Sequence, residues 1–400
     1  MNYTLQKQEN AQRIRNYRIN PSDGEVDYYP SYIQLEHTNR CNAQCIMCNH
    51  FYLGNRGAND ISDEVINLLE PILPFCQSIM LNGDGEPFLC RNIEKYLRLY
   101  HKYNIRVGTN TNLCALTPEM FSILGESIDF INISCDSYEK ETFERIRNGL
   151  DYSLFIGNLK RLNIIAPKIR KNLDCVLMVQ NIIQTPDIVV FASEFGFDSV
   201  KFNLLGVNPC ISNGDDSVLN CFNAASYYLK LAARKAKELD IEITYPQIFN
   251  HTIDENLLEI EQRELLDYDW SVIERRKLLC KKQYPNASLE NDYLGYEVDL
   301  NILHREAISA PKTCQWGLER CYIDVAGNIT TCCYNVQYYM GNLLRAGSFD
   351  KIWNGSMYQQ FRINMLKGNL PNWCKECGYY WGQINTNFAG ELMTNEDSRI

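Results

Sequence analysis

Three thiols fall within the stretch Arg40-Cys41-Asn42-Ala43-Gln44-Cys45-Ile46-Met47-Cys48, at the spacing Cys-x3-Cys-x2-Cys. Three thiolates on one short loop can occupy three corners of a cubane iron–sulfur cluster, which leaves one iron free to bind a small molecule. The alternatives are coincidence and a zinc site, which needs a fourth ligand such as His37 or His50. Because iron–sulfur clusters prefer thiolate ligands, we expect a cluster here.

The composition is that of a large acidic protein. The chain has 400 residues, a formal net charge of −10 and 17 cysteines. This length suits more than one hydrophobic core, and the charge argues against a nucleic-acid partner. The N-terminus lacks the pattern of a secretory signal, and no apolar run approaches the roughly 18 residues of a membrane span. We therefore expect a cytoplasmic protein without a membrane partner, whose clustered thiols bind metal or act in redox chemistry.

Short β-like runs alternate with helix-length amphipathic segments from about residue 31 to residue 245. Such units indicate parallel strands with right-handed crossovers, which close toward a barrel with its chemistry at the carboxyl ends of the strands. Six units predict an α/β fold, a partial (β/α)6 TIM-like barrel with an open side. The predicted strands are Tyr32–Glu36, Ser78–Leu81, Arg106–Thr109, Asp129–Ser134, Leu173–Val179 and Ser199–Leu204. The predicted helices are Ser62–Leu73, Asn92–Tyr103, Thr117–Leu124, Tyr138–Ile164 (as two helices), Pro186–Phe195 and Ser217–Leu239.

A second loop follows the next predicted helix and strand. Its sequence is Asn82-Gly83-Asp84-Gly85-Glu86-Pro87. Together with the cysteine loop it resembles the signature of the radical S-adenosylmethionine (SAM) superfamily, whose Gly-Gly-Glu-Pro loop holds the methionine amino group of SAM. Here aspartate replaces the first glycine. Because glycine allows close backbone approach and a carboxylate accepts hydrogen bonds from an ammonium, the resemblance implies that Gly85 and Glu86 bind SAM.

The same resemblance points to four more SAM-contacting positions. Asn112 lies in the turn Thr111–Leu113, which resembles the family's Thr-Asn-Gly turn with leucine in place of glycine. Ser134 and Asp136 end the fourth predicted strand, where the family has polar residues that face the ribose or the substrate. Taken singly, these features are also typical of ordinary turns. Met47 stands where the family often has an aromatic residue whose backbone meets the adenine.

The resemblance implies SAM and a [4Fe-4S] cluster on Cys41, Cys45 and Cys48. In the family, an electron from the reduced cluster cleaves SAM to a 5′-deoxyadenosyl radical, which removes a hydrogen atom from the substrate. The electron would come from a donor protein such as a flavodoxin or a ferredoxin. Because a primary carbon radical attacks the C–H bonds that it meets, this chemistry needs an enclosed, dry site.

A second set of cysteines lies after residue 310. Cys321–Cys333 alternates around Gly327-Asn328, which predicts a β-hairpin. This region resembles the auxiliary-cluster domains called SPASM and twitch, although the longer cysteine array of full SPASM domains is missing. The resemblance implies one auxiliary [4Fe-4S] cluster held by Cys314, Cys332, Cys374 and Cys377. Cys333 in place of Cys332, a role for Cys321, and a zinc ribbon on the same four thiols are the alternatives.

These features divide the chain into five parts. The predicted parts are an N-terminal extension at 1–30, the barrel at 31–245, a helical insertion or bridging segment at 246–312, the SPASM/twitch-like domain at 313–385 and a tail at 386–400. Most remaining cysteines are expected to be small buried hydrophobic residues. Cys210 follows the sixth predicted strand on the face where the substrate should lie, so it is a candidate catalytic residue that returns a hydrogen atom to the product.

Three functions fit these features. The first is a radical SAM oxidoreductase or epimerase acting on a small polar metabolite such as an amino sugar or polyol, a class in which a single auxiliary cluster occurs. The second is a maturase that modifies a peptide or protein by thioether formation, epimerisation or side-chain oxidation. The third is a non-catalytic zinc or iron–sulfur sensor, which has no use for Glu86. Because only about 30 residues precede the first strand, too few for a peptide-recognition domain, we expect the first function.

Overall fold

A computed structural model of the protein describes residues 3–19, 24–48, 50, 59–206, 213–283, 314–333, 338–367, 369 and 374. Within these residues, ten strands form one sheet in the order β10-β9-β8-β1-β2-β3-β4-β5-β6-β7. The parallel strands are β1 Tyr32–Leu35, β2 Ser78–Leu81, β3 Arg106–Thr111, β4 Phe130–Ser134, β5 Arg170–Leu177, β6 Ser199–Leu204 and β7 Glu242–Thr244. The six predicted strands are confirmed. β7 was not predicted, because three residues carry too little periodicity to show a strand.

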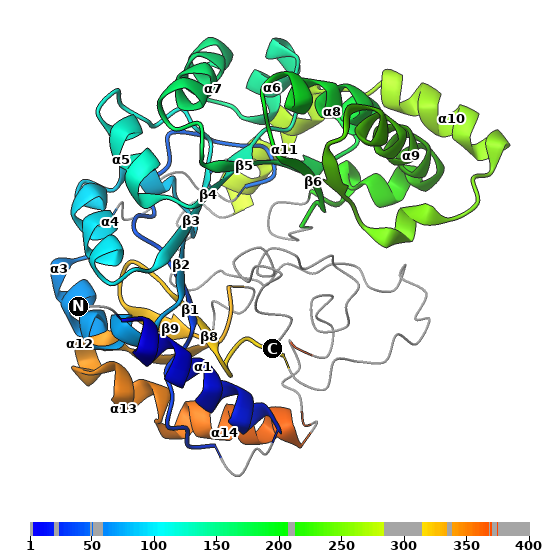
Figure 1. The fold of residues 1–400 in the computed structure, drawn as a ribbon. Helices are drawn as coiled ribbons and strands as arrows, with labels where there is room; N and C mark the ends of the chain where they lie inside the picture. The colour runs from blue at the N-terminus through cyan, green and yellow to red at the C-terminus, as the bar shows by residue number, and fades with distance from the viewer. Residues whose placement is uncertain are drawn as a thin grey trace.

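Helices cover the convex side of the curved sheet (Figure 1). They are α3 Asp63–Leu69, α4 Ile93–Lys102, α5 Met120–Ser127, α6 Lys140–Ile146, α7 Tyr152–Ile165, α8 Thr185–Glu194 and α9 Phe222–Leu239. Short 3-10 helices lie between them, at η1 Glu70–Phe75, η2 Pro87–Leu89, η3 Ile182–Gln184, η5 Gly214–Asp216, η6 Val218–Cys221 and η7 Gln247–Asn250. The capping signals act as the sequence indicates: the Ser62 side chain accepts a hydrogen bond from the Val65 N–H, and Pro186 stands in the first turn of α8.

The two faces of the sheet differ in chemistry. Alternate residues of a strand point to opposite faces. On β5, Leu173, Cys175 and Leu177 lie in the main hydrophobic core, so Asn172 and Asp174 face the concave, inner side. The same alternation places further polar residues on the inner side, namely Asn110, Asn132, Ser134, Ser199, Lys201 and Asn203. Because bulky apolar side chains usually fill a TIM barrel, this polar lining distinguishes the inner face from packed core.

The C-terminal hairpin extends the barrel sheet. β8 (Arg320–Ile323) and β9 (Asn328–Thr330) are antiparallel, which confirms the predicted hairpin, and β10 (Tyr339–Asn342) pairs with β9. β8 also pairs with β1 in parallel. Helices α12 (Leu343–Ala346), α13 (Phe349–Trp353) and α14 (Ser356–Leu366) follow and lie near the end of the sheet that β8, β9 and β10 form (Figure 1). The cysteine-rich region is therefore continuous with the barrel.

Further helices lie outside the repeating units. α1 (Thr4–Ile19) falls in the part predicted only as an extension, and the Lys7 ammonium donates a hydrogen bond to the Asn104 carbonyl at 2.6 Å. α10 (Glu255–Leu266) and α11 (Ser271–Gln283) form the bridging segment after β7, where helical sequence was predicted. In the described part of the chain, no helix combines the length and apolar character needed to cross a membrane.

Candidate SAM site and auxiliary cluster site

The cysteine loop follows β1 and is tied to the segment after α6. The Gln44 N–H donates to the Asn148 carbonyl at 2.7 Å, and the Ile46 N–H donates to the Ile146 carbonyl at 2.9 Å. These two backbone hydrogen bonds pair the loop with a neighbour from another part of the sequence. They hold the cysteine loop against the end of α6.

The three thiols of this loop are half-buried and lie close to one another. Burial raises the pKa of the Cys41 thiol to about 12, with smaller contributions from Glu86 and Cys45. Burial also raises the pKa of Cys45 and of Cys48, and the Cys45 and Cys41 thiols raise that of Cys48 further. Iron would replace the protons that these thiols otherwise keep, so the donor set fits a cluster.

A cubane cluster places different demands on its ligands from a single metal ion. Each cysteine binds a different iron, so the thiols need not converge on one point. We propose Cys41, Cys45 and Cys48 as the ligands of such a cluster.

The Glu86 loop packs directly against the cysteine loop. The Glu86 N–H donates to the Arg40 carbonyl at 2.8 Å. A Cβ atom at Gly85 would lie 2.3 Å from the Thr38 carbonyl oxygen and 2.6 Å from that of Arg40. Only glycine fits this contact, so Gly85 allows the two loops to pack directly against each other.

Glu86 is held by the end of the third strand. Its carboxylate accepts hydrogen bonds from the Thr111 hydroxyl at 2.7 Å and from the Asn112 N–H at 2.8 Å. Burial raises the pKa of Glu86 to about 7, although these two hydrogen bonds lower it. The Asn112 side chain donates to the Asn42 Oδ1 at 2.7 Å, which joins this strand end to the cysteine loop.

The turn after Asn112 keeps the shape of a glycine turn. Leu113 has φ +65°, a left-handed conformation that the family's glycine adopts without strain. Its side chain is fully buried, and its carbonyl accepts a hydrogen bond from the Asn158 side chain at 2.9 Å. Packing and hydrogen bonds therefore hold a leucine where the resemblance expects glycine.

Asp136 lies behind the cysteine loop rather than at an open surface. Its carboxylate forms an ion pair with Arg147 at 2.7 Å and accepts the Val176 N–H at 2.7 Å, and its side chain has no exposed surface. The Arg147 guanidinium also reaches the Cys45 sulfur at 3.9 Å. We therefore assign Asp136 the role of holding Arg147 beside the cysteine loop. Arg147 was missed in the sequence, because an arginine after a helix usually caps it.

Ser134 ends β4 on the inner face, where it is half-buried. In the register of the sheet, Ser134 lies opposite Asp174 of β5, and Asp174 lies opposite Lys201 of β6. Asp174 and Lys201 are both buried. These three polar side chains are thus in register on neighbouring strands and lie side by side on the inner face, toward the carboxyl ends of the strands.

Three cysteines of the C-terminal region gather on the inner face. Cys314, Cys332 and Cys333 pack around an apolar cluster formed by Tyr32, Met80, Phe130 and Trp316. Cys321 instead lies in the main core with no exposed surface. Cys374 is half-buried, whereas Cys377 and Cys210 lie outside the described residues. Both Cys332 and Cys333 are therefore placed to join Cys314 in an auxiliary site, and Cys321 is not.

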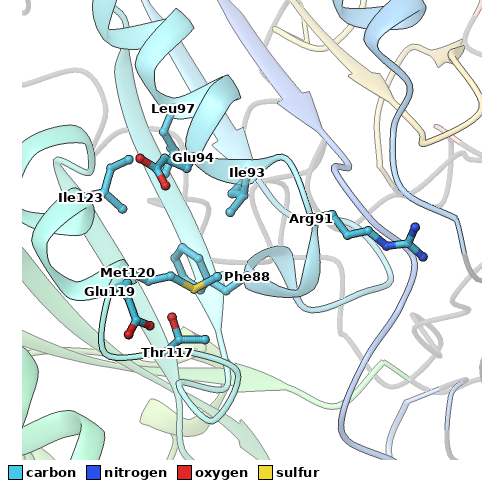
Figure 2. Close-up of a pocket in the computed structure, with 9 residues that line it drawn as sticks. All are labelled: Phe88, Arg91, Ile93, Glu94, Leu97, Thr117, Glu119, Met120 and Ile123. Atoms are coloured by element: carbon cyan, nitrogen blue, oxygen red, sulfur yellow. The ribbon is translucent and has the colours of Figure 1, made fainter.

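A small pocket of about 150 Å³ lies on the helix side of the sheet, between α4 and α5 (Figure 2). It is lined by Phe88, Arg91, Ile93, Glu94, Leu97, Thr117, Glu119, Met120 and Ile123. None of the predicted site residues lines it. The carboxyl ends of the strands, and not this pocket, bring the site residues together.

Two family models match this chain. The model described as the radical SAM superfamily matches residues 35–166, and the iron–sulfur cluster-binding SPASM model matches residues 314–378. Among curated proteins, the chain is similar to a probable GTP 3′,8-cyclase of Methanocella arvoryzae, with 29% identity over 32% of this chain and 44% of that protein. It is also similar to the tungsten-containing aldehyde ferredoxin oxidoreductase cofactor-modifying protein of Pyrococcus furiosus, with 26% identity over 44% and 52% of the two chains. The matches thus span about half the length of these relatives.

The fold is similar to that of a solved structure, Streptococcus suis SuiB bound to the precursor peptide SuiA. The TM-score is 0.56 at 12% identity, with 93% of this chain and 73% of that chain covered. The family models therefore identify the part of the chain that carries the candidate site as a radical SAM domain. More particularly, the chain contains a radical SAM domain at residues 35–166 and a SPASM domain at residues 314–378. These two domains imply SAM, a [4Fe-4S] cluster and auxiliary iron–sulfur binding.

Proposed function

We propose that this protein is a radical SAM enzyme that abstracts a hydrogen atom from a small polar metabolite, such as an amino sugar or polyol, and so oxidises or epimerises it. The observation that carries the radical SAM part is the direct contact between the three-thiol loop and the Glu86 loop. The Glu86 N–H donates to the carbonyl of Arg40, the residue before Cys41. A donor such as a flavodoxin or ferredoxin would reduce the cluster. The reduced cluster and bound SAM would then supply a 5′-deoxyadenosyl radical at this site.

The residues of this site have separable roles. Cys41, Cys45 and Cys48 would hold the cluster. The Glu86 carboxylate, fixed by Thr111 and Asn112, would accept hydrogen bonds from the methionine ammonium. The backbone of Met47 would lie against the adenine, as the resemblance implies.

The inner face supports a polar substrate. Asn132 donates to Asn110 at 2.8 Å, Asn172 donates to Asn132 at 2.9 Å, and the Ser199 hydroxyl donates to Asn172 at 2.8 Å. The next layer of inner-face side chains toward the carboxyl ends of the strands consists of Ser134, Asp174 and Lys201. Hydroxyl, carboxylate and ammonium groups in one layer match the hydrogen-bonding groups of a sugar or polyol.

Three cysteines of the proposed auxiliary site lie on the same inner face. On β4, Phe130 belongs to the apolar cluster beside Cys314 and Cys332, while Ser134 stands at the opposite end of the strand. A cluster at this position would sit on the substrate side of the sheet. Its proposed role is to accept the second electron of an oxidation.

Modification of a peptide is the second candidate. It is favoured by the similarity in fold to SuiB, which was solved with a precursor peptide. Because the identity is only 12%, this similarity supports a shared fold more strongly than a shared substrate.

The first test is anaerobic reconstitution followed by iron and sulfide analysis. Two cubane clusters predict about eight irons per chain, and SAM with dithionite should then yield 5′-deoxyadenosine. The Cys41, Cys45 and Cys48 to alanine variant should keep about four irons and lose this product. A fully reconstituted wild type that forms no 5′-deoxyadenosine would refute the proposal.

The substrate class is tested by deuterium transfer. Deuterated polyols, amino sugars and peptides are supplied separately to the reconstituted enzyme with SAM and dithionite. Deuterium in 5′-deoxyadenosine identifies both the substrate and the abstracted position. Transfer from a peptide and not from a sugar would replace the first candidate by the second.

A further inference from the structure

The bridging segment is fastened to the barrel by a buried ion pair. Arg276 of α11 pairs with Asp216 of η5, and their side chains are 5% and 1% exposed. The Asp216 backbone carbonyl in turn accepts the Val179 N–H at 3.0 Å, just beyond the end of β5. α11 is thus anchored at the carboxyl edge of the sheet, where it lies beside β5 in Figure 1.

Two neutral side chains complete this network. Gln180 donates to the Asp216 carboxylate at 2.8 Å, and the Tyr268 hydroxyl donates to it at 3.0 Å. Tyr268 lies in the linker between α10 and α11. The buried Asp216 carboxylate is held in place by these donors. Removal of Arg276 would leave its negative charge buried without a compensating cation.

The anchored segment packs on the cysteine loop. Ile273 of α11 forms a small apolar cluster with Ile46, Ile146, Met178 and Leu205. Met47, Val176 and Trp270 are partly buried against the same cluster. Met178 directly follows β5 and Leu205 directly follows β6, so this cluster lies at the mouth of the barrel.

Trp270 is the aromatic member of this cluster. It is half-buried, and the Arg145 guanidinium lies 4.9 Å from its ring centroid. An adenine ring has two apolar faces and binds best against apolar or aromatic surfaces. Met47, which the proposed function places beside the adenine, belongs to the same cluster.

We infer that the start of α11 forms a wall of the adenosine pocket, with Trp270 and Ile273 as contact residues and the Asp216–Arg276 pair as the positioning element. This inference rests on the proposed SAM site and extends it to the bridging segment. It predicts that the bridging segment affects the adenosine end of SAM and leaves the methionine end unchanged.

The test measures binding of two probes to the reconstituted protein. S-adenosylhomocysteine reports both ends of the cofactor by calorimetry, and L-methionine alone reports the amino-acid end by its effect on the spectrum of the reduced cluster. Trp270→Ala and Arg276→Gln should raise the Kd of S-adenosylhomocysteine by roughly three- to tenfold. Both variants should leave the Kd of methionine unchanged.

Matched controls lie on the same helix. Arg275 forms an exposed ion pair with Asp269 at 3.0 Å, with side chains 62% and 59% exposed, so Arg275→Gln removes an equal charge without touching the cluster. Leu278 is 68% exposed, so Leu278→Ala is the control for truncation. Both controls should bind S-adenosylhomocysteine as the wild type does.

The outcomes separate this inference from the proposed function. A wild type that binds neither probe would refute the SAM site itself. A wild type that binds both, with Trp270→Ala indistinguishable from Leu278→Ala, would refute only the role of α11. If Arg276→Gln does not fold, Trp270→Ala decides, because its half-buried side chain can be truncated without opening the core.

Discussion

At the scale of the residue, Glu86 shows how the site selects a cation. Its buried carboxylate accepts one hydrogen bond from a side chain and one from the backbone of the next strand end. These donors fix its orientation, and the charge of Arg147, which forms an ion pair with Asp136, also favours the ionised carboxylate. A methionine ammonium would add a direct cationic partner, because charge-assisted hydrogen bonds are the strong ones.

The raised pKa of Glu86 predicts a pH dependence of SAM binding. With a pKa of about 7, the carboxylate is ionised at pH 8 and mostly protonated at pH 6. Only the ionised form attracts an ammonium, so the Kd of S-adenosylhomocysteine should rise roughly tenfold as the pH falls from 8 to 6. Calorimetry between pH 6 and pH 8 measures this slope. In Glu86→Gln, binding should be weak and nearly independent of pH, and an unchanged slope in that variant would contradict the assignment.

Gly85 predicts a second effect at the same scale. A Cβ atom here would overlap the Thr38 and Arg40 carbonyls, so Gly85→Ala must push the Glu86 loop away from the cysteine loop. We expect at least a tenfold loss of S-adenosylhomocysteine affinity with about four irons retained in the SAM-binding cluster. Gly157 of α7 has no atom within 4 Å of its Cβ position, so Gly157→Ala is the matched control. Equal affinity of the two variants would count against the contact.

At the scale of the element, the position of each cysteine within or beyond a strand decides on which face of the sheet its thiol lies. Cys321 on β8 points into the main core, whereas Cys332, just beyond β9, lies at the inner face with Cys314 and Cys333. Alternation along β8 places Cys321 on the core side, whereas the adjacent Cys332 and Cys333 follow the end of β9 and share the inner face.

This sorting predicts the iron content of single variants. Cys314→Ala should lose up to about four irons after reconstitution, whereas Cys321→Ala should keep all of them and lose only folding stability. Cys332→Ala and Cys333→Ala, measured in parallel, show which of the two adjacent thiols binds metal. Loss of iron in Cys321→Ala, or zinc in place of iron in the wild type, would contradict this assignment.

At the scale of the whole molecule, the C-terminal region is part of the barrel sheet. β8 covers the edge of β1 in parallel register, from Tyr32 opposite Arg320 to Leu35 opposite Ile323. Glu36, just after β1, accepts the Asp84 N–H at 2.7 Å and the Val325 N–H at 3.2 Å. One carboxylate therefore joins the Glu86 loop to the hairpin.

Truncation tests this continuity. A chain that ends at residue 313 leaves the edge of β1 unpaired, and unpaired edges promote association and aggregation. We expect a Tm lower by about 5 °C or more and a shift to larger species in size-exclusion chromatography. A chain that ends at residue 385 removes only the predicted tail and should behave like the full chain. A monomeric 1–313 chain with an unchanged Tm would show that the two parts fold independently.

The sequence alone determined the local features of this protein. The spacing of Cys41, Cys45 and Cys48, the Glu86 loop and the six strands are each set within a few residues, because turn chemistry and hydrophobic alternation act locally. The parallel order of the strands then follows from the repeated units. This was enough to predict the barrel and the hairpin, whereas the contact between the two loops came from the structure.

Only the tertiary structure decided what pairs across long distances in the chain. It placed Arg147 against Asp136 and Cys45, Arg276 against Asp216, and β8 beside β1. It also showed that Leu113 keeps the left-handed conformation of a glycine turn. Such pairings carry no local signal, since an arginine on a helix or a hairpin after a linker has many possible partners, and burial in the folded chain selects one.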